Sequence, residues 1–380
     1  MRPRVGLIIN PLAGAGGKLG LHGSDGLGCA ASVWSSDRAA IALASFCELG
    51  SSIDWISGPG AMGEDLLRSR GAAPQVLALK HPGPSSAADT RALARRMREL
   101  GVDLLLFAGG DGTARDVQAG VLAAALSGGD GDQALPVLGI PAGVKMQSAC
   151  FGVSPAAAGR LARAFLATRA RRTEPREVMD MDEAALREGR VLPQLHGYLA
   201  TPTDPRLLQG RKTRSLPCDS EAATALAQSL VAELSRGVHV IGPGSTTWAL
   251  KQALKLAGSL IGVDLVIDGK LWLRDATEQE LHDFLLATPR RAGLWLTAIG
   301  GQGHVIGRGN APLSARVLRA IGPAAMTVLI TPAKLQALAG QCAGLLRMDS
   351  ACAEVDALFS GPVRVLSGPR DRAMLNLVAE

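Results

Sequence analysis

The sequence predicts an α/β protein with a Rossmann-like parallel sheet in its first half and a strand-rich second domain. Three observations lead to this prediction. Short apolar runs alternate with amphipathic stretches from residue 5 to about residue 140. The run at 102–108 is almost continuously apolar and leads into glycines, which is typical of a strand buried on both faces of a parallel sheet. In the second half, Asp268-Gly269 separates two apolar runs and signals a hairpin.

The elements of the first half follow in chain order. The run at 5–9 is apolar and ends at Asn10-Pro11, so a buried strand is expected there. A helix at 37–49 ends at Gly50, and a helix at 86–100 ends at Gly101, since glycine commonly stops a helix. The strand at 102–108 follows, and further elements are strands at 53–56, 76–79 and 137–140 and a helix at 114–126.

The second half is expected to begin near residue 173, where charged residues and prolines interrupt the pattern, giving domains at 1–173 and 174–380. The last 50 or so residues are expected to pack back on the first domain. Thr277 and Glu280 form a capping box that opens a helix at 278–286. The other elements expected here are strands at 238–241, 265–267, 270–273, 294–299, 327–330 and 363–366 and a helix at 248–257.

Composition excludes several classes of function. The net charge is +6, yet the basic cluster Arg169, Arg171 and Arg172 has no aromatic residue among it, so nucleic-acid binding is not expected. The six cysteines show no Cys-x-x-Cys spacing, which argues against structural zinc and a disulfide framework. No apolar run approaches the ~20 residues of a membrane span. We therefore expect a cytoplasmic protein without a resident metal or a membrane partner, and its basic balance suits an anionic small molecule.

The chemistry is expected at the loop Gly109-Gly110-Asp111-Gly112-Thr113, which joins a buried strand to a helix. Backbone N–H groups and the helix dipole favour phosphate at such a place, and glycines allow close approach. Phosphate repels a carboxylate, so Asp111 needs a function there. It could accept a proton from an attacking hydroxyl or help to hold Mg²⁺. The alternative is a Gly-Asp-Gly tight turn with no ligand.

Five segments in order resemble the ATP-NAD kinase family, including its acetoin-cluster branch, within the superfamily that also holds diacylglycerol-type lipid kinases. Gly-Gly-Asp-Gly-Thr at 109–113 is the superfamily signature. The segments 5–17 and 139–146 resemble the family's opening strand and loop and the branch's second glycine segment. Gly242-Pro-Gly-Ser-Thr-Thr-Trp resembles the Thr-Gly-Ser-Thr-Ala-Tyr loop of NAD kinases, and 300–310 resembles a further branch motif.

The resemblance implies a phosphofructokinase-like first domain, an NAD-kinase-type second domain and the transfer of a phosphoryl group from ATP or polyphosphate to NAD. It also implies Mg²⁺ accompanying ATP and a homo-oligomer. Asp111 would be the general base, and the substrate would lie at the carboxyl ends of the strands, between the domains. The nucleotide contacts that it implies, together with those suggested by the residues themselves, are Asn10, Gly109, Gly110, Gly112, Thr113, Lys145, Asp182, Glu183, Gly244, Ser245, Thr246 and Thr247.

The chain departs from the family pattern at two places. NAD kinases carry an Asn-Glu pair that contacts the dinucleotide, and here Asp182-Glu183 stands as a substitute. Family members tend to place a basic residue five positions after the loop Asp, where this chain has Asp116. Asp180 would share a strand face with Asp182 and could hold Mg²⁺ or ribose hydroxyls, or be a solvent-facing strand edge.

Glycine-rich loops of other kinds are excluded by spacing. Gly17-Lys18 lacks the upstream glycine and the following Ser or Thr of a Walker loop, and Gly14 and Gly16 lack the third glycine of a dinucleotide fingerprint. In the segment 300–310, His304 and Arg308 could bind phosphate. A diacylglycerol-type lipid kinase and a non-catalytic NAD-binding regulatory protein remain alternatives to the NAD kinase.

Overall fold

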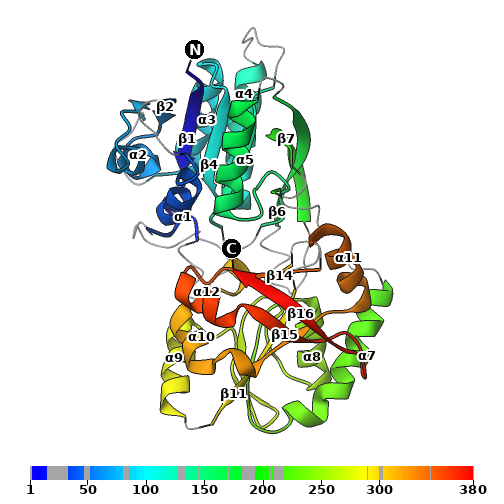
Figure 1. The fold of residues 1–380 in the computed structure, drawn as a ribbon. Helices are drawn as coiled ribbons and strands as arrows, with labels where there is room; N and C mark the ends of the chain where they lie inside the picture. Colours follow the sequence, from blue (N-terminus) through cyan, green and yellow to red (C-terminus); the bar gives the residue numbers. More distant parts are fainter. Residues whose placement is uncertain are drawn as a thin grey trace. The chain divides into compact units, whose positions relative to one another are not determined.

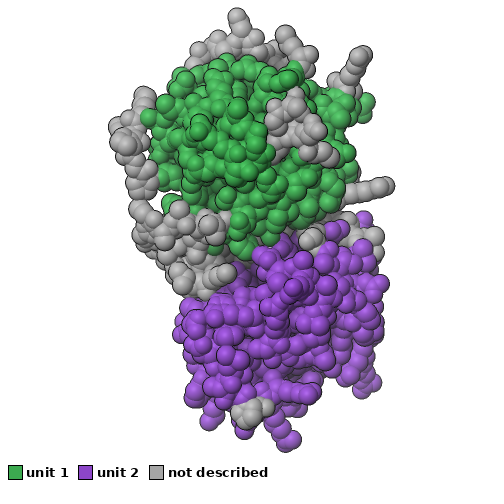
Figure 2. All heavy atoms as spheres, turned by 60° about the vertical axis from the view of Figure 1, so that its left-hand side comes forward, with its two compact units in different colours: residues 1–15, 24–211 green, residues 16–23, 212–380 purple. Residues whose placement is uncertain are grey.

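The computed structural model describes residues 2–14, 33–46, 52–79, 85–126, 134–143, 146–168, 171–181, 193–204, 207–208, 217–288, 290–298, 303–342 and 344–379. The chain forms two compact units, of which the first holds residues 1–15 and 24–211 and the second holds residues 16–23 and 212–380 (Figure 2). In the described part of the chain, no helix combines the length and apolar character that crossing a membrane requires.

The first unit is built on a parallel five-stranded sheet of order β3-β2-β1-β4-β5, which confirms the predicted α/β class (Figure 1). Its elements are β1 (Arg4–Ile9), α1 (Val33–Leu43), β2 (Asp54–Ser57), η1 (Gly60–Met62), α2 (Glu64–Ser69), β3 (Gln75–Val76), α3 (Ala87–Glu99), β4 (Leu104–Gly109), α4 (Asp111–Leu126), β5 (Val137–Pro141) and α5 (Pro155–Ala167).

Helices cover both faces of this sheet. Leu104 and Leu106 of β4 pack with α1 and α5, whereas Leu105 and Phe107 face α3 and α4. All six residues of β4 are buried, as the apolar run at 102–108 predicts for a central parallel strand. The strand order reverses direction between β1 and β4, and such switch points are where open α/β sheets bind ligands.

The division between the units lies later than the boundary expected near residue 173. The strands β6 (Thr173–Met181) and β7 (Pro193–Pro202) pair as an antiparallel ladder that belongs to the first unit. The reason is apolar packing, because Val178 and Leu199 are buried in the same core cluster as α3 and α4.

The second unit holds a nine-stranded sheet of order β10-β9-β8-β11-β13-β15-β16-β14-β12 among its described residues. The strands β8, β11, β13 and β15 are parallel to one another. The last 50 or so residues contribute β15 and β16 to this sheet, so their apolar residues have partners inside their own unit. The strands are β8 (Val238–Ile241), β9 (Asp264–Ile267), β10 (Lys270–Leu273), β11 (Ala292–Thr297), β12 (His304–Ile306), β13 (Met326–Leu329), β14 (Leu346–Met348), β15 (Gly361–Leu366) and β16 (Arg372–Ala379).

Two groups of helices pack on the sheet of the second unit. Leu294, Leu296 and Val328 lie in one cluster with α9, α10 and α12. Trp295 and Leu329 point to the other face and pack with α7 and α8. The helices are α7 (Pro217–Leu234), α8 (Ser245–Ala253), α9 (Glu278–Ala287), α10 (Ala315–Ile321), α11 (Pro332–Cys342) and α12 (Ala353–Phe359), with short 3₁₀ turns η2 (Arg308–Asn310) and η3 (Pro323–Ala325).

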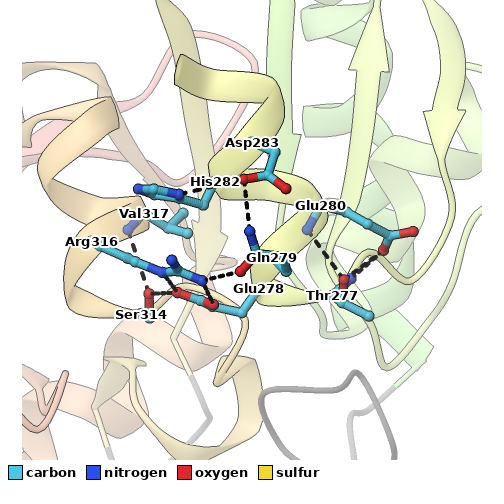
Figure 3. Close-up of polar contacts among 9 residues, drawn as sticks. All are labelled: Thr277, Glu278, Gln279, Glu280, His282, Asp283, Ser314, Arg316 and Val317. Carbon is cyan, nitrogen blue, oxygen red and sulfur yellow. Dashed lines mark hydrogen bonds and ion pairs between the residues drawn. The ribbon is translucent and has the colours of Figure 1, made fainter. Parts of the chain in front are cut away.

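The predicted hairpin and capping box are both confirmed. Asp268 and Gly269 have φ of 48° and 75°, and this pair of positive values joins β9 to β10 as a tight two-residue turn. Thr277 accepts a hydrogen bond from Glu280 N–H, and Glu280 in turn accepts one from Thr277 N–H. Beside this box, Arg316 forms a two-pronged ion pair with Glu278 and ties α10 to α9 (Figure 3).

A fully buried ion pair joins α8 to the first residue of β9. Lys251 and Asp264 both have fully buried side chains, and 2.9 Å separates Nζ from Oδ2. Lys251 Nζ also donates to the carbonyl oxygens of Ser259 (2.7 Å) and Gly262 (3.1 Å). Burial lowers the pKa of Lys251, while Asp264 acts in the opposite direction. The pair fixes the carboxyl-terminal half of a short helix whose first residues are the predicted nucleotide contacts.

Candidate functional site

Asn10 and the 109–113 loop lie at the carboxyl edge of the sheet of the first unit, at the switch point between β1 and β4. Asn10 follows β1, and its Nδ2 donates to Thr113 Oγ1 on α4 over 2.9 Å. Asn10 Oδ1 accepts the N–H of Leu12, which shapes the loop after β1. Gly110 immediately precedes α4, and its carbonyl accepts Ala114 N–H as the helix begins. The structure therefore brings Asn10, Thr113 and the 109–113 loop together.

Asp111 is buried, with 6 % exposure, and begins α4. Its Oδ2 accepts Gln147 N–H at 2.6 Å, and its Oδ1 accepts Ser148 N–H at 2.9 Å and the Ser148 hydroxyl at 2.7 Å. Ser148 Oγ also lies 2.9 Å from Met179 O, but its single proton favours the charged carboxylate. Met179 N–H in turn donates to Ser148 Oγ. Three donors thus orient an acceptor-only group, as an ionised carboxylate requires.

Two glycines of the loop differ in what surrounds them. A Cβ on Gly109 would lie 2.4 Å from both Cβ and Oγ1 of Thr113, so packing against the threonine requires glycine. A Cβ on Gly112 would meet no atom of the described residues within 4 Å. Gly112 lies in the first turn of a helix, where glycine costs roughly 0.5–1 kcal/mol relative to alanine. Neither packing nor helix propensity therefore accounts for Gly112, whereas close approach of a ligand would.

Two residues of α4 that follow the loop form ion pairs with neighbouring elements. Arg115 pairs with Asp180 of β6 at 2.7 Å, so Asp180 joins the hairpin to α4. Asp116 pairs with Arg91 of α3 at 2.7 Å, and burial raises the pKa of Asp116 while Arg115 and Arg91 act to lower it. The acidic residue at position 116 is therefore part of a helix–helix contact.

Cys150 lies near the same loop but cannot serve as a nucleophile in this environment. Its thiol is fully buried, and burial raises its pKa far above the ordinary value. The charge of Asp111 adds to that rise. A thiol held in its protonated form is a small apolar filler and not a reactive group.

The predicted hydroxyl loop lies in the second unit, at the start of α8. Gly244 has φ of 124° and a Cβ there would meet Thr297 Cγ2 at 2.4 Å, so glycine is required. Gly244 is the N-cap residue and no side chain caps the helix, so capping does not explain the hydroxyls. Thr247 donates to Gly244 O at 3.0 Å. Ser245 and Thr246 instead accept hydrogen bonds from Lys334 Nζ of α11, at 3.2 and 2.8 Å.

Some predicted site residues lie outside the described part of the chain: Lys145, Asp182, Glu183 and the side chain of Arg308. His304 is described and is buried at the start of β12. Asn310 donates to Val305 O at 2.8 Å and accepts Gly307 N–H at 2.9 Å, which shapes the turn after that strand. That segment is held by its own turn contacts.

Three residues of these sites have no individual signal in the sequence: Gln147, Ser148 and Lys334. The first two contact Asp111 from 36 and 37 positions along the chain. Only the pairing of β4 with β5 brings the segment after β5 to the loop after β4. Lys334 is one of many cations in the sequence, and its position beside the hydroxyl loop depends on the packing of α11.

The described residues contain no group of three or more His, Cys, Asp or Glu side chains gathered as metal ligands. The donor set at the 109–113 loop is one carboxylate that already accepts three hydrogen bonds. Mg²⁺ usually keeps several waters and is bound through one or two carboxylates together with substrate phosphates. This loop suits a cation carried in by a phosphate ligand better than a resident ion.

Comparison with protein families gives two matches that together span about two thirds of the chain. The ATP-NAD kinase N-terminal domain matches residues 56–170, which include the 109–113 loop. The ATP-NAD kinase C-terminal domain matches residues 237–377, which include the hydroxyl loop and nearly all of the second sheet. Neither a curated protein nor a solved structure matches the chain.

Proposed function

The chain belongs to the ATP-NAD kinase family, and on that premise we propose that it transfers a phosphoryl group from ATP or polyphosphate to the ribose 2′-hydroxyl of NAD. Membership of the family makes it an NAD kinase-like phosphotransferase. The identity of donor and acceptor and the role of Asp111 are parts of the proposal. We further propose that the enzyme acts in the cytoplasm as a homo-oligomer.

One observation supports the proposal most strongly: a buried, oriented carboxylate stands beside open space at a helix N-terminus. Asp111 begins α4, and in the described part of the chain no atom lies within 4 Å of where a Cβ on the neighbouring Gly112 would be. The N-terminus of a 16-residue helix favours phosphate, and the missing side chain leaves room for its oxygens. A carboxylate that attracts a proton and a helix end that attracts phosphate are what phosphoryl transfer to an alcohol needs.

In the proposed reaction, Asp111 accepts the proton of the attacking hydroxyl. The hydroxyl oxygen bonds to the terminal phosphorus as the bond between that phosphorus and the leaving phosphate oxygen breaks. The amides of Gln147 and Ser148 hold the carboxylate in place, so little rearrangement is needed. Mg²⁺ bound to ATP would offset the charge of its phosphates.

The remaining nucleotide contacts are proposed from the family pattern. Asn10 and Thr113 lie at the loop itself and bond to each other. The hydroxyls of the loop Gly244–Thr247 are proposed as further nucleotide contacts. Asp182 and Glu183 would accept hydrogen bonds from ribose hydroxyls and repel a 2′-phosphate, so NAD should bind more tightly than NADP. Calorimetric titration with both dinucleotides tests this order, and tighter binding of NADP contradicts it.

The test of the catalytic proposal is Asp111→Asn, with NADP formation measured from ATP, Mg²⁺ and NAD. Removing a general base should lower kcat by roughly 10²–10⁴-fold. Asn also turns an NH₂ group toward one backbone donor, at a cost of about 1–3 kcal/mol. The melting temperature must therefore be measured beside activity, and kcat expressed per folded molecule.

Asp116→Asn is the matched control, because it makes the same change in a buried carboxylate on the same helix. It should keep near-native kcat, since Asp116 pairs with Arg91. Near-native turnover by folded Asp111→Asn would show that Asp111 is not the base. A diacylglycerol substrate run in parallel distinguishes the lipid-kinase alternative, and NAD binding without turnover by the unaltered chain would identify a regulatory protein.

A further inference from the structure

Polar groups of the second unit gather at the carboxyl edge of its parallel strands β8, β11, β13 and β15. Lys334 of α11 donates to Ser245 and Thr246 at the start of α8. Both helices begin at this edge, because α8 follows β8 and α11 follows β13. Two helix N-termini and an ammonium group favour negative charge at one place.

Two threonine hydroxyls at this edge are buried and have no hydrogen-bond partner among the described residues. Thr297 ends β11 and Thr331 lies two residues beyond β13, with exposures of 7 % and 0 %. No described residue forms a hydrogen bond with either Oγ1. Thr297 pairs in register with Leu329, so the two side chains lie on one face of the sheet. Thr331 lies between β13 and α11, and its carbonyl oxygen accepts the N–H of Leu335 as that helix begins. Leu329 packs with α7 and α8, which identifies that face as the one bearing the hydroxyl loop.

A carboxylate completes the cluster from α7. Asp219 is 7 % exposed, and its Oδ1 has no hydrogen-bond partner among the described residues. Burial lowers the pKa of Lys334, and the charge of Asp219 acts to raise it. Asp219 and Lys334 nevertheless form no direct ion pair. Leaving a buried carboxylate oxygen and two buried hydroxyls unmatched is costly unless a ligand binds them.

We propose that this edge binds a sugar phosphate group, with Lys334, Ser245 and Thr246 contacting the phosphate and Asp219 accepting a hydrogen bond from a sugar hydroxyl. The two charges orient such a ligand, because Lys334 attracts its phosphate and Asp219 repels it. Thr297 and Thr331 supply hydroxyl donors between them. Ser245 and Thr246 are also proposed NAD contacts, so the inference rests on that part of the proposed function. It adds Lys334, Asp219 and the two threonines to the site and names the chemical class of the ligand. Binding of inorganic phosphate or ribose 5-phosphate is measured without phosphoryl transfer, so failure of this inference is distinguishable from failure of NADP formation.

The amine of Lys334 offers a direct readout. The full-length chain is labelled briefly with acetic anhydride, with or without inorganic phosphate or ribose 5-phosphate, and labelling at each lysine is measured by peptide mass spectrometry. Both ligands should protect Lys334 by fivefold or more. Exposed Lys270, on the β9–β10 hairpin of the same unit, serves as the internal control and should label equally in all samples. Equal labelling of Lys334 with and without ligand overturns the proposal.

Variants then separate the contacts. Thr331→Val keeps the side-chain shape, and its affinity for phosphate, read from the protection of Lys334, should fall about tenfold. Asp219→Asn should weaken the binding of ribose 5-phosphate more than the binding of inorganic phosphate, because only ribose 5-phosphate carries sugar hydroxyls. The variants Lys334→Met and Lys270→Met are each titrated with inorganic phosphate in a calorimeter. Only Lys334→Met should lose one phosphate site, with the affinity of that site reduced roughly 10- to 100-fold. An unchanged number of sites and unchanged affinity in Lys334→Met contradict the assignment even if NADP formation proceeds normally.

Discussion

Replacing Lys251 by Met should destabilise the second unit strongly. The substitution keeps the length of the side chain and removes its charge. Asp264 is then left as a buried carboxylate without its cation, and the carbonyl oxygens of Ser259 and Gly262 lose their shared donor. A buried charge that loses its partner costs far more than the net contribution of the pair itself.

The magnitude follows from what remains around Asp264. Breaking a buried pair typically costs about 3–5 kcal/mol. Asp264 keeps two backbone donors, the N–H groups of Ser259 and Asp275, both at 2.7 Å. These partly replace the lost ammonium and place the expected cost near the lower end, at about 3 kcal/mol. For a unit of roughly this size, a change of 1 kcal/mol shifts the melting temperature by about 2–4 °C, so about 6–12 °C is expected.

Differential scanning calorimetry of the full chain measures this shift, since two units can unfold in separate transitions. Hydrogen exchange of the α8 amides assigns the loss to the second unit. Lys270→Met removes an exposed lysine from the same unit and should shift the transition by less than about 1 °C. The double variant Lys251→Met/Asp264→Asn should be more stable than the sum of its single changes predicts. A Lys251→Met protein with native stability would refute the reasoning.

Three smaller experiments address the two sites. Gly109→Ala should cost about 1–3 kcal/mol, because the new methyl group would overlap Thr113, and thermal melting measures it. Gly112→Ala should leave the free energy of unfolding unchanged or raise it by up to about 1 kcal/mol, while ATP binding weakens. Unaltered ATP binding would contradict a ligand at Gly112. Phosphate protection of Lys334, measured above pH 8, should fade below the ordinary lysine pKa of 10.5, because burial lowers the pKa of Lys334 and binding needs the ammonium form. Fading only at or above pH 10.5 would contradict this.

The first unit was predictable because local patterns and tertiary structure agree there. The apolar runs at 5–9 and 102–108 became β1 and β4, and the glycine loop lies where a buried strand meets a helix. The start of α5 also has a sequence signal, because Ser154 caps the helix and Pro155 is its first residue, a common combination at helix starts. Sequence patterns therefore locate the loop of Asp111 reliably.

The partners of the site residues were not predictable. Ser148 reaches Asp111 through the pairing of two strands, and Lys334 reaches Ser245 and Thr246 from 88 or more positions away. Such contacts depend on packing between elements, for which a single sequence gives no periodic signal. The boundary near residue 173 was misplaced for a related reason, because Val178 and Leu199 become core residues only when the hairpin folds onto α4.

The β6–β7 hairpin determines where the chain can be cut. A fragment that ends at residue 173 would leave behind Met179, whose N–H bonds to Ser148, and would uncover the apolar surface that Val178 and Leu199 shield. Such a fragment should aggregate or be degraded, and it could not report on Asp111. A fragment that ends after residue 208 keeps the hairpin. Such a fragment carries the Asp111 loop together with Gln147, Ser148 and Met179, so the contacts that hold the carboxylate are all on the same piece of chain.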